Sequence, residues 1–111
     1  MTPTEIIFAD KFFPLIKNGK KTTTVRAGKR DYRICSIYDI YNPDKTVHGR
    51  VYVTCKYCIP FGELTEETAR TDGFGSLDEL KKELLQFYPD LTNESPVTVV
   101  AFTTDFKEEK E

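Results

Sequence analysis

The segment SLDELKKELLQFYP, residues 76–89, predicts one well-defined amphipathic helix. Ser76 and Glu79 have the spacing of a capping box, in which the two residues satisfy each other's backbone N–H groups at the start of a helix. Pro89 ends the helix because proline cannot continue the hydrogen-bond pattern. One apolar stripe follows the cap at helical spacing, and it consists of Leu77, Leu80, Leu84 and Phe87 or Tyr88. Any fold of this chain must therefore bury one side of this helix.

Most of the remaining chain has the composition of β-strands. Runs rich in Val, Ile, Thr and aromatic residues occur at 5–8, 20–26, 34–42, 47–59 and 96–106. The third and fourth runs flank NPDKT, a turn sequence, and so predict a hairpin. The order strand, helix, strands, short helix, helix, strand predicts an α+β domain, built on a curled sheet or open β-barrel of mixed strands with flanking helices. Parallel βαβ winding fits this order poorly.

Within the fourth run, residues alternate in the manner of a strand with two different faces. One face is mixed polar, and the other is apolar, with Val47, Gly49, Val51, Val53, Cys55, Tyr57 and Ile59.

Two shorter helices are also expected. In DKFFPLIKNG, Asp10 is a candidate cap, and Pro14 limits the helix to a first turn near 11–13. Asn18 and Gly19 predict its end, because both tolerate the left-handed conformation that closes a helix. LTEETART, residues 64–71, predicts a second short helix before DGFG breaks it.

The length of 111 residues suits one domain, which we expect to span residues 1–106, followed by a charged, frayed tail at 107–111. No apolar run approaches the roughly 18 residues needed to cross a membrane, and the amino terminus lacks a secretory signal. A cytoplasmic location is therefore expected. The three cysteines, Cys35, Cys55 and Cys58, are an odd number and are expected to be free thiols.

Charge is distributed unevenly along the chain. The net charge is −2, but residues 1–60 carry +6 and residues 61–111 carry −8. A local positive surface near a cleft could attract a phosphate or a nucleobase-bearing molecule despite the acidic total. Alternatively, folding intermixes the two halves and no such surface forms.

The sequence contains only weak matches to known catalytic, metal-binding or phosphate-binding motifs. The pair in CKYC, Cys55 and Cys58, has metal-ligand spacing, but a zinc site needs four ligands, and only Cys35 and His48 could complete it. His48 is the only histidine and has no nucleophile signature beside it. The glycines of DGFG do not form a phosphate-binding loop. We therefore expect no metal and no cofactor.

The stretch NGKKTTTVR, residues 18–26, carries the most suggestive chemistry. In an ideal strand, Thr22, Thr24 and Arg26 share one face and Lys21 faces the other way. A threonine nucleophile needs a general base, and without a histidine this base would be a lysine whose pKa is lowered by burial or by cationic neighbours such as Lys20. The alternative is a strand whose lysines are simply solvated.

Two segments resemble the ASCH domain, a PUA-like β-barrel family associated with RNA metabolism. They are IIFADKFFPLIKNGKKTTTVR, with its glycine, basic pair and Thr-x-Thr-x-Arg, and LTEETARTDGFGSLDELKKELLQFYP. The resemblance covers about residues 5–106. In size and layout the chain is similar to a small bacterial subgroup of N(4)-acetylcytidine amidohydrolases, which remove an acetyl group from the exocyclic amine of a modified nucleoside.

This resemblance implies a catalytic triad and a substrate. Lys21 would be the general base, Thr24 the nucleophile and Asp72 the acid that protonates the leaving amine. The family pattern has a glutamate where this chain has Asp72, and Gly-Asp where it has Cys35-Ser36. Lys20, Thr22 and Arg26 are the expected substrate-binding residues, with Arg26 or strand amides as oxyanion donors. The implied partner is a nucleoside or another small molecule derived from RNA.

A binding module without catalysis is the main alternative, and a ribonuclease is a third. RNA or a modified nucleoside would then be held by cationic side chains, namely Lys20, Lys21, Arg26, Lys29 and Arg30. Aromatic rings could stack on bases, and the candidates are Tyr32, Tyr38, Tyr41 and Tyr52. The sequence leaves the oligomeric state open.

Overall fold

Five strands form one mixed sheet in the order β1-β3-β4-β5-β2. The computed structural model describes residues 5–104. The strands are β1 (Glu5–Ile7), β2 (Thr23–Ala27), β3 (Ser36–Tyr41), β4 (His48–Pro60) and β5 (Pro96–Thr103). The helices are α1 (Phe13–Lys17), α2 (Glu66–Thr71) and α3 (Leu77–Phe87), with short 3-10 helices η1 (Asp10–Phe12) and η2 (Phe61–Glu63). β1 pairs with β3 in parallel, whereas all other neighbours are antiparallel. The expected α+β class with an open, curled sheet is confirmed.

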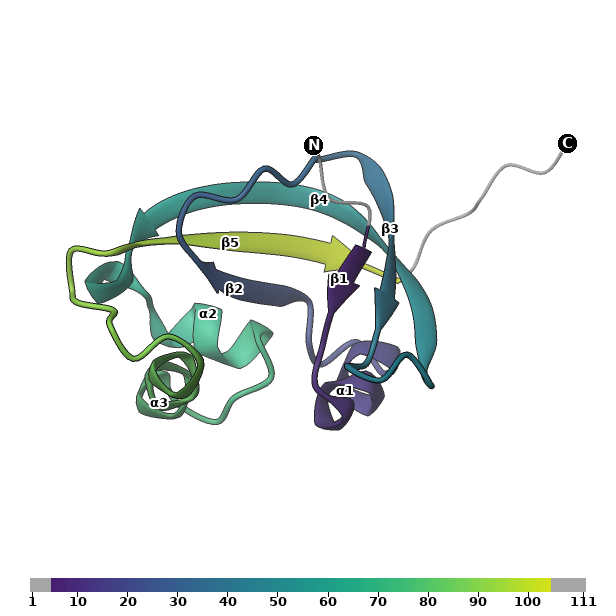
Figure 1. Cartoon of the computed structure of the whole chain (residues 1–111), viewed down its shortest axis with the longest axis horizontal. Helices are drawn as coiled ribbons and strands as arrows, with labels where there is room; N and C mark the ends of the chain where they lie inside the picture. Colours follow the sequence, from purple (N-terminus) through teal and green to yellow (C-terminus); the bar gives the residue numbers. More distant parts are fainter. Residues whose placement is uncertain (1–4, 105–111) are drawn as a thin grey trace, which may run out of the picture.

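The sheet curls so that the two edge strands approach each other, with the helices on one side (Figure 1). β4 pairs with β3 along its first half and with β5 along its second half. The edge strands β1 and β2 are joined by Arg26, whose Nη2 donates to the carbonyl of Ile7 at 2.8 Å. The open side of the barrel therefore lies between β1 and β2, and the helices are placed around it.

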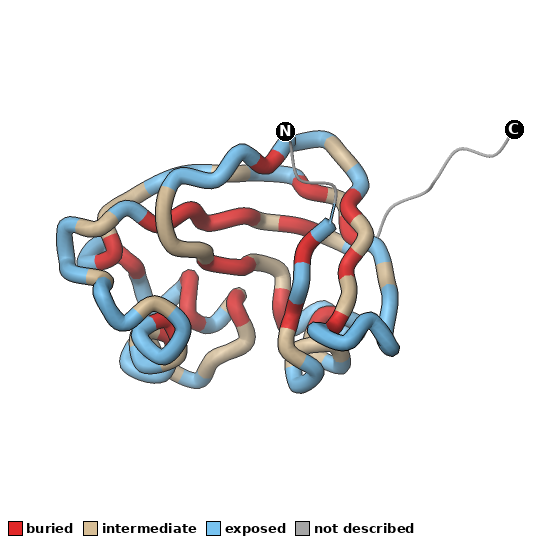
Figure 2. Tube along the Cα trace, in the orientation of Figure 1, coloured by how far each residue is buried: buried red, intermediate tan, exposed pale blue. Residues whose placement is uncertain are grey.

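Both faces of β5 are covered, which explains its continuous apolar sequence. Val97 and Val99 belong to a cluster with Leu80 of α3, and Val100 and Phe102 belong to a second cluster around β1 and β3. Figure 2 shows buried residues following β5 along most of its length, whereas the loops and the outer sides of the helices are exposed.

The helix at 76–89 forms as its sequence predicts. The Ser76 hydroxyl accepts a hydrogen bond from the Glu79 N–H at 3.3 Å and begins α3. Leu80 and Leu84 of the apolar stripe are buried against the sheet, but Phe87 is 63% exposed at the end of the helix. The predicted hairpin of β3 and β4 and the short helix α2 are confirmed as well.

Two local expectations near the start of the chain are wrong. Asp10 does not cap a helix, since Ala9 precedes η1 and the Asp10 carboxylate instead accepts a hydrogen bond from Asn42 at 2.7 Å. Pro14 does not limit the helix, because it lies in the first turn of α1, where its missing N–H has no intrahelical partner to lose. Asn18 ends α1 and Gly19 follows with φ +80°, as expected.

The alternation expected in β4 breaks in the middle of the strand. Val51 and Val53 are fully buried, but a register shift between Val53 and Cys55 interrupts the pairing with β5. Beyond this irregularity Cys55 and Tyr57 are exposed, and the apolar face does not continue.

Several smaller expectations can also be compared with the structure. Cys35, Cys55 and Cys58 are free, as predicted, and all three are exposed. None of the helices in residues 5–104 combines the length and the apolar character needed to cross a membrane. The charged tail at 107–111 lies outside the described residues, as do the last two residues of the strand expected at 96–106.

Candidate functional site

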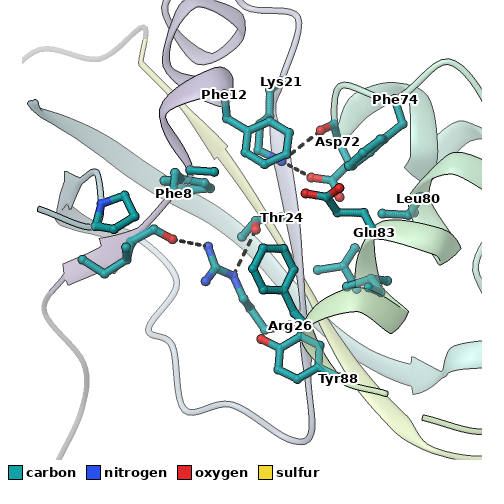
Figure 3. Close-up of a pocket in the computed structure, with 16 residues that line it drawn as sticks. Phe8, Phe12, Lys21, Thr24, Arg26, Asp72, Phe74, Leu80, Glu83 and Tyr88 are labelled. Atoms are coloured by element: carbon teal, nitrogen blue, oxygen red, sulfur yellow. Dashed lines mark hydrogen bonds and ion pairs between the residues drawn. The ribbon is translucent and has the colours of Figure 1, made fainter. Parts of the chain in front are cut away.

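A cavity of about 250 Å³ opens between the β1–η1 segment, β2 and α3 (Figure 3). Its wall is largely apolar and includes five aromatic residues, Phe8, Phe12, Phe74, Phe87 and Tyr88. Its polar side chains are Lys21, Thr24, Arg26, Asp72 and Glu83. The structure therefore gathers four of the residues named from the sequence, together with a glutamate that was not named.

Lys21 reaches this cavity because it lies in the turn before β2. The N–H groups of Lys20 and Lys21 both donate to the carbonyl of Leu15, and β2 begins only at Thr23. Strand alternation therefore does not apply to Lys21. This removes the conflict between Lys21 and Thr24, which an ideal strand would place on opposite faces.

A buried pair of opposite charges is the central feature of the cavity. The Nζ atom of Lys21 donates to the carboxylate of Asp72, and also to its backbone carbonyl at 2.9 Å. Both residues are 3% exposed. Asp72 is the residue at which α2 ends, and its N–H donates to the carbonyl of Thr68. The end of α2 thus fixes the carboxylate in front of the lysine.

Gly73 allows this close approach. Its φ is +94°, in the left-handed region that favours glycine. A Cβ atom at this position would lie 3.1 Å from Cδ1 of Leu15 and 3.6 Å from Cβ of Lys21. The glycine after Asp72 therefore serves both the turn and the packing of the loop against Lys21.

Burial changes the proton affinity of both members of the pair. Desolvation lowers the pKa of Lys21 below its ordinary value of 10.5, and the charge of Arg26 lowers it further, although Asp72 opposes the shift. Desolvation also raises the pKa of Asp72 to about 6, against the opposing effect of Lys21. Both shifts disfavour the ionised forms, so they favour a lysine that can accept a proton and a carboxyl that can donate one.

Thr24 lies beside a fixed guanidinium. Its hydroxyl is held in the buried part of the wall and accepts a hydrogen bond from Nε of Arg26 at 3.1 Å. Arg26 is fixed by its bond to Ile7 and by the ring of Phe8, whose centre lies 5.2 Å from Cζ. Within residues 5–104 the hydrogen bonds link Thr24 to Arg26 and Lys21 to Asp72, and none joins Lys21 directly to Thr24.

Aromatic rings enclose the ammonium of Lys21. Its Nζ lies 4.5 Å from the centre of the Phe12 ring and 5.6 Å from that of Phe8. Phe12 packs edge-on against Phe74, with ring centres 5.8 Å apart. These rings exclude water from the lysine, which is the physical cause of its lowered pKa.

Glu83 was not identified from the sequence. It extends from α3 into the cavity wall, and its carboxylate pairs with Lys11 of η1 at 3.1 Å. A signal was present in the sequence, because Glu83 lies three residues after Leu80 and directly before Leu84, at the border of the apolar stripe. A charged residue at that border points to a polar site beside the core.

Other residues proposed from the sequence lie outside the cavity wall. Lys20 is exposed and its backbone N–H donates to the Asn18 side chain, while the N–H of Thr22 donates to the carbonyl of Thr71. Lys29 and Arg30 are exposed in the loop after β2. The site as built thus uses Lys21 and Arg26 as its cations.

The proposed tyrosine platforms have other positions. Tyr32 and Tyr38 are buried in the core and contact each other edge-on, so they cannot stack on a base. Tyr41 stacks on His48, and Tyr52 is half-buried on β4. The aromatic faces at the cavity come instead from the phenylalanines and from Tyr88.

Cys35 occupies a special backbone position. Its φ is +58°, in the left-handed region where glycine is preferred. The turn before β3 therefore has a backbone conformation suited to glycine, the residue that the family resemblance implies here, although this chain has a cysteine. The structure shows no group of three or more potential metal-ligating side chains among the described residues.

The fold and this cavity define an ASCH-type α+β domain. The family model for the ASCH domain matches residues 4–104, and the chain belongs to this family. No curated protein matches the chain significantly.

Solved structures agree with this assignment at the level of the fold. The ASCH domain from Lactobacillus crispatus JV V101 superposes with a TM-score of 0.75 at 15% identity, over 91% of this chain and 80% of that one. Protein EF3133 from Enterococcus faecalis V583 gives 0.70 at 15% identity, over 90% and 75%. The S128A mutant of ZmASCH from Zymomonas mobilis gives 0.69 at 17% identity, over 92% and 70%.

Proposed function

We propose that the cavity hydrolyses the amide of an N-acylated nucleoside such as N(4)-acetylcytidine, with Thr24 as nucleophile, Lys21 as general base and Asp72 as general acid. The observation that carries this proposal is the buried Lys21–Asp72 pair in the same cavity as a threonine hydroxyl. Purely structural ion pairs are rarely both fully buried and set in the wall of a cavity, because desolvation of two charges is costly.

The protonation states available to Lys21 and Asp72 suit amide hydrolysis. Burial disfavours the ionised form of each group and so lowers the free energy needed to reach the neutral pair, in which Lys21 is an amine and Asp72 a carboxylic acid. Lys21 then takes the hydroxyl proton as Thr24 attacks the acyl carbon, and Asp72 gives its proton to the departing exocyclic nitrogen. The products are an ester on Thr24, the free amine and the Lys21–Asp72 ion pair.

The second half of the reaction restores the starting state. Asp72, now a carboxylate, takes a proton from water as the water oxygen attacks the ester carbon. Lys21, now an ammonium, returns a proton to the Thr24 oxygen as the ester bond breaks. The released acid carries away the acyl group, and the pair is neutral again. No metal or cofactor is needed for this balance.

Arg26 supplies the charge that this chemistry requires. Its guanidinium donates to the Thr24 hydroxyl oxygen, the atom that becomes negative as its proton leaves. In the proposed mechanism the same cation also stabilises the oxyanion that develops on the acyl oxygen. Since Arg26 is fixed by Ile7 and Phe8, little reorganisation is needed during the reaction.

The dimensions and lining of the cavity favour a small, flat substrate. Its volume of about 250 Å³ lies just below the range of about 300–1,000 Å³ typical of small-molecule sites. Aromatic rings suit the faces of a nucleobase, and a few polar groups suit its edge. These features support a nucleoside, free or at an accessible position of RNA, as the partner.

The test is release of cytidine from N(4)-acetylcytidine, followed chromatographically. Lys21→Ala and Thr24→Ala are compared with Lys20→Ala and Thr22→Ala, which remove neighbouring side chains of the same type outside the cavity wall. We expect the first two variants to lose at least about 1,000-fold in kcat/KM and the two controls to stay within a few-fold of wild type.

The opposite results are equally informative. If the folded wild type releases no cytidine, the catalytic proposal fails and the cavity is a binding site. If Lys20→Ala and Thr22→Ala lose as much activity as the cavity variants, the residues assigned here are wrong, and the substrate contacts lie on the exposed side of the Lys-Lys-Thr segment.

A further inference from the structure

Glu83 is a second carboxylate of the cavity that the proposed reaction does not use. It enters the wall from α3, whereas Asp72 enters from the end of α2 (Figure 3). The Glu83 side chain is 17% exposed, compared with 5% for Asp72. One acidic group is therefore deep in the cavity, and the other is nearer its opening.

The two carboxylates differ in how firmly they are held. Asp72 is engaged by the buried ammonium of Lys21. Glu83 pairs with Lys11, whose side chain is 57% exposed. Because the Lys11 side of this pair is exposed to solvent, the pair contributes little to stability, and Glu83 can exchange Lys11 for another donor at small cost. A carboxylate also has about four acceptor positions, more than one ammonium contact uses.

A donor is present on the proposed substrate. The nitrogen of an N-acylated exocyclic amine carries one hydrogen, and in the proposed reaction this nitrogen must face Asp72 to receive a proton. Within the cavity wall, Asp72 and Glu83 are the two carboxylates, and Asp72 must carry a proton when the bond breaks. An amide hydrogen directed at the other carboxylate would hold the nitrogen in the required orientation.

We propose that Glu83 accepts the hydrogen bond of the substrate's amide N–H and so makes the site selective for secondary amides. This inference rests on the proposed function. Glu83 is then a specificity-determining residue, and substrates acylated on a nitrogen without hydrogen are disfavoured. The negative charge of Glu83 also raises the pKa values of Lys21 and Asp72, in keeping with its proximity to the pair.

A purely structural role for Glu83 makes a different prediction. Its pair with Lys11 joins α3 to η1, and Lys11 also lies over the ring of Phe12 at 5.1 Å. If Glu83 acted only through this bridge, then removal of Lys11 would have the same effect as removal of Glu83. Lys11→Met is therefore the matched control, since Lys11 is not part of the cavity wall.

The experiment measures binding by titration calorimetry in a Thr24→Ala background, in which the nucleoside is not cleaved. The two probes are N(4)-acetylcytidine and its N(4)-methyl derivative, which lacks the amide hydrogen. We expect a preference of about 10-fold or more for the first probe, since hydrogen bonds to charged groups are the strong ones. Adding Glu83→Met should abolish the preference, and adding Lys11→Met should leave it intact.

Two results would overturn the inference. If the preference for the probe with the amide hydrogen persists in Glu83→Met, its cause is steric. If it is lost equally in Lys11→Met, its cause is the Glu83–Lys11 ion pair and not a hydrogen bond to the substrate. Circular dichroism establishes that each variant is folded. If Glu83→Met does not fold, the isosteric Glu83→Gln is used in its place. Its neutral amide oxygen is a weaker acceptor, so the preference should fall to about threefold. An unchanged preference in Glu83→Gln would overturn the inference.

Binding separates this inference from the proposed function. If wild type releases no cytidine but the Thr24→Ala protein discriminates between the probes through Glu83, hydrolysis is refuted and the role of Glu83 stands. If wild type cleaves N(4)-acetylcytidine and the preference does not depend on Glu83, only the inference fails. Absence of binding to both probes would overturn the inference, and together with no cytidine release by wild type it would overturn the proposed function as well.

Discussion

Replacement of Asp72 by asparagine should change how the stability of the protein depends on pH. Asp72→Asn keeps the size of the side chain and an oxygen that can accept from Lys21, but it removes the titration. In the folded wild type the pKa of Asp72 is raised to about 6 by burial. In the unfolded chain it returns to about 3.9.

The sign and size of the effect follow from these two pKa values. Because the folded state binds the proton more tightly, the stabilisation is complete below the unfolded pKa and is lost as pH rises through the folded pKa. A difference of about two pKa units corresponds to about 3 kcal/mol, of which about 2 to 3 kcal/mol falls between pH 4 and pH 7. In the variant, Lys21 loses its counter-ion, which lowers its pKa further. A lowered pKa of Lys21 makes the variant more stable as pH rises. The stability of wild type relative to the variant therefore falls further with rising pH, in the same direction as the effect of Asp72.

The assay is urea unfolding of wild type and Asp72→Asn at several pH values from 4 to 8. We expect the free energy of unfolding of wild type to fall by about 2 to 3 kcal/mol relative to the variant between pH 4 and pH 7. Asp31→Asn, which removes an exposed carboxylate, is the control and should show no such trend. A difference between wild type and Asp72→Asn that is flat over this range would refute the assignment of a raised pKa to Asp72.

Three further predictions concern the same site. Lys21→Met should lower the free energy of unfolding in urea at pH 7 by about 3 to 5 kcal/mol, because it leaves a buried carboxylate unpaired. The double variant Lys21→Met with Asp72→Leu should recover most of this loss. Equal losses in the single and the double variant would contradict the pairing. Gly73→Ala should destabilise the protein by about 1 to 3 kcal/mol, because φ at this position is +94° and the new Cβ meets the side chain of Leu15. Gly75→Ala, at an ordinary φ, is the control and should destabilise less. The reverse order in thermal unfolding would refute the backbone argument. Arg26→Lys cannot reproduce both hydrogen bonds of the guanidinium, so kcat should fall by about 100-fold in steady-state kinetics, and an unchanged kcat would exclude Arg26 from oxyanion stabilisation.

The parts of the fold that could be predicted are those set by local signals. The cap at Ser76 and the turn sequence between β3 and β4 act over a few residues, and the helix and the hairpin both form as expected. The capping box is only half formed, because the Glu79 carboxylate accepts from the N–H of Gly75 rather than from that of Ser76. The errors occurred where a local signal was ambiguous. Pro14 is compatible with both the end and the first turn of a helix, and the register shift after Val53 depends on pairing with β5 rather than on the sequence of β4 alone.

The site was predictable only in part, for a related reason. Thr24 and Arg26 are two residues apart on one strand, so their contact follows from strand geometry. Lys21 and Asp72 are separated by 51 positions, and no periodicity connects them. Their pairing in the sequence analysis came from the family resemblance, and the structure supplies its physical basis in the turn at Lys21 and the helix end at Asp72.

Glu83 illustrates what the sequence analysis overlooked. The prediction for α3 used its cap and its apolar stripe and assigned no role to Glu83, which lies at the border of that stripe. Whether such a residue faces solvent or a cavity depends on what packs against the helix. Here the β1–η1 segment provides the opposite wall, so the carboxylate is only 17% exposed.

The most direct test of the central claim is to look for an acyl group on Thr24 during turnover. The protein is mixed with N(4)-acetylcytidine, quenched in acid after short intervals and digested, and the peptide that contains Thr24 is examined by mass spectrometry. The proposed mechanism predicts a transient acetyl group on Thr24 that appears together with cytidine and is absent from the Thr24→Ala protein. Full cytidine release by Thr24→Ala, or an acetyl group that accumulates on another side chain, would contradict it.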